Sequence, residues 1–227
     1  MTIVDHRALI EAQMAEMAKR LSAPSGDKVR FKGSSSMTLP DNTDTERLTC
    51  VILDFCTHNL FYEGRFNRDN IQPPTCYSIG YEPALMLPAA EAPVRQFDSC
   101  DRCPKNQFGS DGNGKACKNT RVLAVAPIAT GGDSDVPPVW LVSVPPSATR
   151  DFDKYIRELQ TKHLTIPAAC VTSITLDGTK TYAYPQFHFV RHLEGEEFQV
   201  FYGLKNEASQ RIFVEPDTSK HKAKANR

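Results

Sequence analysis

The first 44 residues combine one helical hydrophobic pattern with a polar stretch. Four apolar residues recur at spacings of 4, 3 and 4, on one stripe of a helix expected over residues 5–22: Ile10, Met14, Met17 and Leu21. This stripe needs burial, on the rest of the chain or on a second molecule, so the helix is a candidate for self-association. Residues 22–44 are rich in Ser, Gly, Pro and Asp, with one short strand candidate at 28–32. We therefore expect residues 1–44 to form an N-terminal helix and a linker.

Apolar runs of strand length dominate the rest of the chain. A first run covers residues 48–55, and one amphipathic helix is expected near 149–163. The further expected strands are 76–79, 122–128, 139–144, 169–176, 182–190 and 198–204.

Short strands with a single interior helix predict an α+β fold that is mainly β, either an antiparallel barrel or a curved sheet. An oligonucleotide-binding (OB) barrel has this inventory of elements, and so do several other α+β folds. We expect an OB-like domain over residues 45–210, with a loop-rich insertion near 76–121 and a flexible basic tail over 211–227.

Composition narrows the classes of function. The chain has 27 basic and 27 acidic residues, so it is neutral overall, and 40% of its residues are hydrophobic. A protein that binds nucleic acid through uniform positive charge is excluded, and any such binding needs a local basic patch. No apolar run reaches the roughly 20 residues of a membrane-spanning helix. Residues 1–22 carry charges of both signs, unlike a signal peptide. We therefore expect a cytoplasmic protein without a membrane partner.

Seven cysteines are present, and three of them are clustered in the sequence: Cys100, Cys103 and Cys117. In a reducing compartment, clustered thiols favour metal binding over disulfides. Cys100 and Cys103 form a CxxC turn before a proline, and a glycine-rich loop brings the chain back to Cys117. A closed structural zinc site needs four tetrahedral ligands, and Cys76 is the nearest spare donor. The sequence therefore predicts a Zn²⁺-binding loop within the insertion.

Other interpretations of this segment stay open. His58 is a weaker candidate for the fourth ligand, whereas Cys50, Cys56 and Cys170 fall in or beside apolar strands and are expected to be core thiols. A redox CxxC usually opens a helix, and this one does not, while an iron–sulfur cluster would use the same ligands. Residues 109–116 nearly match a phosphate-binding loop, but alanine replaces the hydroxyl residue that holds magnesium.

Basic residues gather around the cysteine cluster. Residues 95–121 hold six basic and three acidic side chains, and aromatic and basic residues alternate between 61 and 77. Unpaired bases stack on aromatic rings at roughly 1–3 kcal/mol each, while basic groups follow the backbone. The alternative is that these charges only solvate a polar loop and that half of the rings are core. The candidate nucleic-acid-binding residues are Tyr62, Arg65, Phe66, Tyr77, Arg102, Lys105, Lys115, Lys118 and Arg121.

Three segments resemble a group of bacteriophage proteins, some of which are considered single-stranded DNA-binding proteins. They are HNLFYEGRFNRDNIQPPTCYSIG, CDRCPKNQFGSDGNGKACKNTRVLAV and LVSVPPSATRDFDKYIRELQ, and the resemblance covers about residues 48–190. It implies a phage replication or recombination factor in the host cytoplasm, with a zinc-bearing barrel and with replication or recombination proteins as partners. It also supports Cys76 as a ligand. Many such binders end in an acidic tail, whereas residues 220–227 are basic.

Together these patterns predict a non-catalytic single-stranded DNA-binding protein with structural zinc. The alternative is a zinc-stapled phage protein that binds a host or phage protein. An enzyme is not expected, because the nearby carboxylates have no spacing that would gather them around magnesium: Asp54, Glu63, Asp69 and Asp98.

Overall fold

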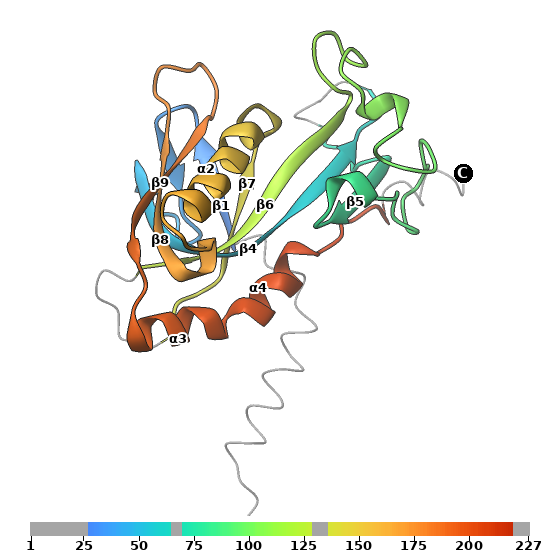
Figure 1. Ribbon diagram of the computed structural model, residues 1–227. Coiled ribbons are helices and arrows are strands. Elements are labelled where there is room, and N and C mark those ends of the chain that lie inside the picture. Colours follow the sequence, from blue (N-terminus) through green and yellow to red (C-terminus); the bar gives the residue numbers. More distant parts are fainter. Residues whose placement is uncertain (1–26, 65–69, 129–135, 220–227) are drawn as a thin grey trace, which may run out of the picture.

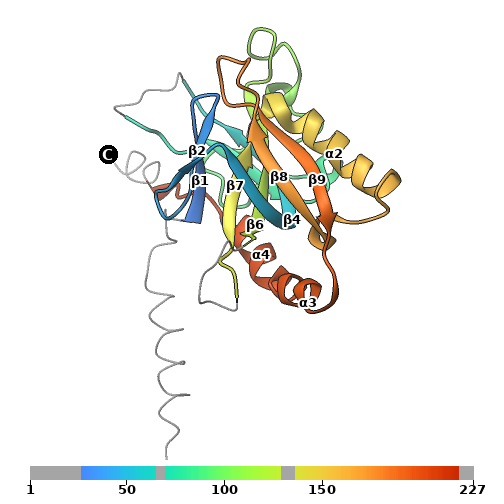
Figure 2. The same ribbon diagram turned by 90° about the vertical axis from the view of Figure 1, so that its left-hand side faces the viewer.

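The computed structural model describes residues 27–64, 70–128 and 136–219, which form a curled sheet with helices on both faces (Figures 1 and 2). The strands are β1 (Lys28–Lys32), β2 (Ser36–Thr38), β3 (Asp44–Thr45), β4 (Arg47–Phe61), β5 (Cys76–Gly80), β6 (Cys117–Pro127), β7 (Trp140–Val144), β8 (Cys170–Leu176) and β9 (Pro185–His192). The helices are α2 (Thr149–Thr161), α3 (Gly195–Gly203) and α4 (Lys205–Ile212). The prediction of a mainly-β α+β fold with a curved sheet is confirmed. The helix expected over residues 5–22 lies outside the described residues.

Strand β4 organises the sheet, because it is 15 residues long and pairs with three other strands. It pairs with β8 near its start, with β6 over most of its length and with β5 over its last five residues, always antiparallel. The strand order is β3-β2-β1-β7-β6-β4-β8-β9, and within the described residues β1 and β7 are the one parallel pair. We call residues 57–61, 76–80 and 117–121 the arm. It extends away from the body of the sheet (Figure 1).

The alternation of side chains along β4 supplies two hydrophobic cores. Ile52 packs in a cluster with Phe152 of α2, on one face of the sheet. Val51 packs in a second cluster with Phe201 of α3 and residues of α4, on the other face. Figure 1 shows α2 over one face of the curled sheet and α3 and α4 below it. The arm is thus rooted in a body that is covered on both faces.

Three expectations differ from the structure. Residues 198–204 lie largely in α3 and not in a strand, because their buried positions Phe201 and Leu204 continue at helical spacing into α4. The strand candidate at 28–32 is confirmed as β1, but the rest of the expected linker is not structureless, because it adds β2 and the start of β3 to the sheet. Residues 211–219, expected in the flexible tail, are packed on the domain, and Ile212 is 0% exposed. Residues 220–227 lie outside the described part of the chain.

Candidate metal centre and nucleic-acid groove

The end of β4 brings the first two thiols together. Phe61 is paired with Cys76 of β5 on one side and with Cys117 of β6 on the other. Residues directly opposite one another in antiparallel strands point to the same face of a sheet. Cys76 and Cys117 therefore lie on one face of the arm, on either side of Phe61.

The other two thiols come from a loop that covers this face. We call residues 81–116 the cysteine lobe. Its backbone lies along the outer edge of β5, where the amide of Ala89 donates to the carbonyl of Tyr77 at 2.9 Å. The amide of Cys100 donates to the carbonyl of Met86 at 3.0 Å, and the side-chain amide of Asn106 donates to the carbonyl of Cys100 at 2.7 Å. These bonds fold the CxxC turn back over the arm.

All four cysteines of the predicted zinc site line one small cavity of about 20 Å³: Cys76, Cys100, Cys103 and Cys117. Each is at most 9% exposed. A cavity of this size has room for one water-sized body. Within the described residues, however, no three His, Cys, Asp or Glu side chains are close enough together to form a coordination shell. The four thiols therefore border one shared space.

Burial sets the protonation of the thiols in this cavity. Burial, together with the neighbouring thiols Cys100, Cys103 and Cys76, raises the pKa of Cys117 to about 12, while Lys115 opposes this shift. Burial likewise raises the pKa of Cys76. Without a cation these thiols keep their protons at neutral pH, whereas a bound divalent ion stabilises the thiolates. Four buried sulfur donors match the ligand chemistry of structural zinc.

The alternative ligand His58 is excluded from this cavity by its position on the strand. Side chains alternate along β4, so His58 lies on the opposite face of the arm from Phe61. Its Nε2 lies 2.7 Å from the carbonyl oxygen of Ile212, and burial lowers its pKa, so the neutral ring donates this bond. The expectation of core thiols at Cys50, Cys56 and Cys170 is confirmed, since none is more than 1% exposed.

The segment that nearly matches a phosphate-binding loop is a tight hairpin. Asp111 and Gly114 form a bridge, and the amide of Gly109 donates to the carbonyl of Gly114 at 2.9 Å. Gly109 and Gly112 have φ angles of +90° and +57°, which only glycine adopts freely. The loop's amides thus bond within the loop, and the glycines serve its geometry.

A groove of about 780 Å³ separates the cysteine lobe from the start of α2. Four basic residues line it, Lys115, Lys118, Arg121 and Arg150, against one acidic residue, Asp101. Two of these cations have ionic partners: Lys118 lies 2.9 Å from Asp111, and Arg121 lies 3.1 Å from Asp153. Four basic residues against one acidic residue give the lining a net charge of +3, which the partner carboxylates Asp111 and Asp153 reduce to +1.

The structure distributes the predicted nucleic-acid-binding residues unevenly. Lys115, Lys118 and Arg121 line the groove. Arg102 and Lys105 are exposed on the cysteine lobe, where Lys105 Nζ lies 5.5 Å from the centroid of the Phe61 ring. Among the other predicted residues that the structure describes, none lines this groove.

The aromatic predictions divide in the same way. Tyr62 is 40% exposed and lines a second cavity of about 910 Å³ beside Lys118. The prediction that Tyr77 offers a surface ring is wrong, because this ring is 2% exposed and its hydroxyl donates to Glu215 at 2.9 Å. Arg65 and Phe66 lie outside the described residues.

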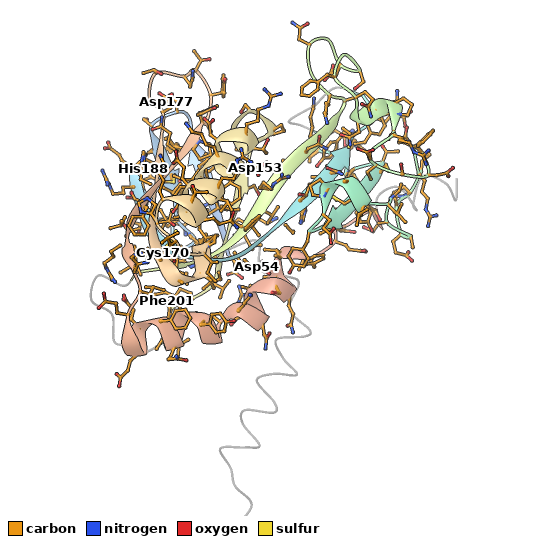
Figure 3. All side chains as sticks on the ribbon, viewed as in Figure 1. Asp54, Asp153, Cys170, Asp177, His188 and Phe201 are labelled. Atoms are coloured by element: carbon orange, nitrogen blue, oxygen red, sulfur yellow. The ribbon has the colours of Figure 1, made fainter. Side chains whose placement is uncertain are left out.

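Arg121 has a structural role in addition to its charge. Its guanidinium donates to both carboxylate oxygens of Asp153, at 3.3 and 3.1 Å, and to the hydroxyl of Thr57 at 2.8 Å. Its side chain is 14% exposed. Figure 3 shows Asp153 on α2, beside β6. Arg121 thus ties α2 to the arm and holds the two walls of the groove together.

Two groove residues were missed by the sequence argument. Phe108, at the tip of the cysteine lobe, is 68% exposed, and the Nζ of Lys115 lies 5.1 Å from its ring centroid. The Cζ of Arg150, from the first turn of α2, lies 6.0 Å from the same centroid. The sequence did show that Phe108 is a lone aromatic residue in a glycine-rich polar loop, and this pattern could have predicted an exposed ring. Nothing in the sequence placed Arg150 beside it.

Comparison with protein families, curated proteins and solved structures gave no match to this chain. Within the residues that the structure describes, no helix is long and apolar enough to cross a membrane.

Proposed function

We propose that this chain is a non-catalytic single-stranded DNA-binding protein whose cysteine lobe is stiffened by structural zinc. The observation that carries the proposal is the groove at the root of that lobe, with four basic residues against one acidic residue. Positive grooves attract the phosphate backbone and release its counterions.

Zinc enters the proposal through the four thiols that share one buried cavity. The ion would be held by Cys76, Cys100, Cys103 and Cys117, and it would fix the lobe against the arm. With four thiolate ligands no coordination position is left for water, so the role is structural. The proposal also includes binding in the manner of an OB fold, with the curled sheet as the platform. It further includes a cytoplasmic location and a part in phage replication or recombination, with proteins of those processes as partners.

A binding titration in a salt series tests the proposal. Purified protein is titrated against a fluorescent oligothymidine, with fluorescence anisotropy as the readout. We expect tight binding at low salt and a linear fall of log K with log salt. The double variant Lys115→Gln/Lys118→Gln should lower this slope by roughly 0.7 for each charge lost from the groove. The control, Lys162→Gln/Lys180→Gln, removes two exposed lysines outside the groove. Absence of binding by the unaltered protein at low salt would refute the proposal.

A second candidate is that the zinc-stapled lobe binds a protein. The observation in its favour is a set of exposed apolar side chains in one segment of the lobe, residues 85–97: Leu85, Leu87, Val94 and Phe97. Exposed apolar patches mark interaction sites when they are contiguous. A stable partner that co-purifies after nuclease treatment, with no oligonucleotide binding by the isolated protein, would favour this candidate over the first.

A further inference from the structure

Phe108 is an aromatic residue that the fold does not use for packing. Its ring is 68% exposed and belongs to neither hydrophobic core. It lines the groove together with Lys115 and Arg150, whose cationic groups lie 5.1 and 6.0 Å from the ring centroid. An exposed ring with two cations beside it, in the lining of a positive groove, is typical of a ligand-binding site.

The loop that carries this ring is internally braced. The hydroxyl of Ser110 donates to the carbonyls of Gln107 and Lys105, at 2.6 and 3.0 Å, and accepts from the amide of Ala116 at 2.9 Å. The side-chain amide of Gln107 donates to the carbonyl of Asp101 at 2.6 Å. Bonds on both sides of Phe108 therefore hold its backbone in one place, so the ring is a preorganised platform that loses little entropy on binding.

We propose that Phe108 is a stacking subsite for one unpaired nucleobase, with Lys115 and Arg150 contacting the phosphates on either side of it. This inference rests on the proposed function and deepens it. A stacked base covers the whole face of a ring, whereas a cation beside an exposed ring makes a smaller contact that water screens. The base therefore replaces the cations over the ring, and the released cations move to the phosphates.

The subsite selects single strands. In a duplex both faces of every base are covered by its neighbours, so a protein ring can stack only where a base is unpaired. It also joins two parts of the protein, because Lys115 belongs to the cysteine lobe and Arg150 to α2. Lys115 is two residues before Cys117, so the subsite keeps its shape only while the lobe is seated on the arm.

The test compares two oligonucleotides that differ only in their bases. Oligothymidine offers bases and phosphates, whereas an abasic strand of equal length offers the phosphates alone. We expect Phe108→Ala to weaken oligothymidine binding by about 5- to 150-fold, the equivalent of one lost stacking contact, and to leave abasic binding unchanged. Phe108→Trp should retain binding, and its added fluorescence should be quenched by oligothymidine but not by the abasic strand.

A matched control is available on α3. Tyr202 is 44% exposed, and the Nζ of Lys205 lies 5.6 Å from its ring centroid, so Tyr202→Ala removes a similar ring outside the groove. Its affinity for both strands should equal that of the unaltered protein. If Phe108→Ala leaves oligothymidine binding intact, or weakens binding to both strands equally, the stacking subsite is refuted while the proposed function stands. If the unaltered protein binds neither strand, the proposed function itself fails.

Discussion

At the scale of single residues, the proximity of the thiols was readable from the sequence, and the exposure of the rings was not. The CxxC turn and the glycine-rich return predicted that Cys100, Cys103 and Cys117 would meet, and the structure places them with Cys76 around one cavity. Tyr77 was misplaced because its exposure depends on a partner distant in the sequence, Glu215. Phe108 was missed for the opposite reason, since aromatic residues are usually assigned to cores.

The thiol centre leads to a prediction about metal and heat. On the proposed function, Cys103→Ser removes one of four zinc ligands, so this variant should lack bound zinc and the stabilisation that comes with it. Metal present at 100 times its Kd stabilises by about 2.7 kcal/mol, which corresponds to a Tm decrease of roughly 5–10 °C for a chain of this size. The measurements are elemental analysis and a melting curve, each with and without chelator.

The matched control is Cys170→Ser, which changes a buried thiol outside the cavity. Its Tm should fall on adding chelator as much as that of the unaltered protein, whereas Cys103→Ser should not respond. A chelator-insensitive melting curve for the unaltered, reduced protein would contradict the zinc site.

Tyr77 leads to a prediction about alkaline pH. Burial, reinforced by the hydrogen bond to Glu215, raises the pKa of Tyr77 to about 12 from 10.0. The stability linked to this shift is fully present below pH 10 and is lost as the pH rises toward 12. Between pH 8 and pH 11 the unaltered protein should lose about 1 kcal/mol more free energy of unfolding than Tyr77→Phe, which has no hydroxyl to titrate. Urea unfolding at both pH values measures this, and equal losses would show that the phenol is not held in its protonated form.

At the scale of elements, the sequence predicted the presence of most strands better than the residues at which they end. The apolar run over residues 48–55 predicted the first half of β4, but the strand continues to Phe61. Its second half carries the buried polar residues Thr57 and Asn59, which lie beneath the cysteine lobe. Because these positions are buried but polar, the hydrophobic pattern did not reveal that the strand continues. The strand assigned at 198–204 was wrong, because a window of seven residues was too short to show the helical spacing that continues into α4.

The contact between α2 and β6 leads to a prediction at this scale. Arg121→Ala leaves Asp153 and Thr57 without their charged partner, which should cost about 1–2 kcal/mol of unfolding free energy, since Asp153 is 37% exposed and partly solvated. Binding to oligothymidine should also weaken, because the walls of the groove are no longer tied. Arg121→Lys should restore the positive charge but not the bidentate geometry of the guanidinium.

The reference for this experiment is Arg191→Ala, which removes an ion pair with Glu197 outside the groove. Urea unfolding and oligonucleotide titration should show a small stability loss and unchanged binding in that variant. If Arg121→Ala binds DNA as well as Arg191→Ala does, Arg121 has no part in shaping the groove.

At the scale of the whole molecule, the sequence predicted a mainly-β α+β fold but not the order of its strands. Local patterns carry no information about which strands are neighbours, and β1 joins the sheet through a parallel pairing with β7 that no turn specifies. The same limit applies to residues 213–219, whose place depends on contacts with residues far away in the sequence, such as the tilted ring contact between Phe213 and Tyr81, with centroids 4.9 Å apart.

Two truncations separate the anchored segment from the basic end. Removing residues 213–227 strips Glu215 from Tyr77 and Phe213 from Tyr81, so we expect a Tm decrease of several degrees. Removing residues 220–227 alone deletes four basic residues and leaves these contacts, so the Tm should not change, although the salt slope of DNA binding should become smaller if the tail contacts phosphate. Equal melting curves for both truncations would show that the segment over 213–219 contributes no stability.

The length of β4 has a consequence for biosynthesis. Its three partner strands begin at residues 76, 117 and 170, so the sheet around β4 cannot close until most of the chain has left the ribosome. Such distant pairings are formed slowly, and the apolar half of β4 stays open to wrong associations in the meantime. Translation speed and chaperone supply, more than the final stability of the fold, should therefore govern how much active protein a cell obtains.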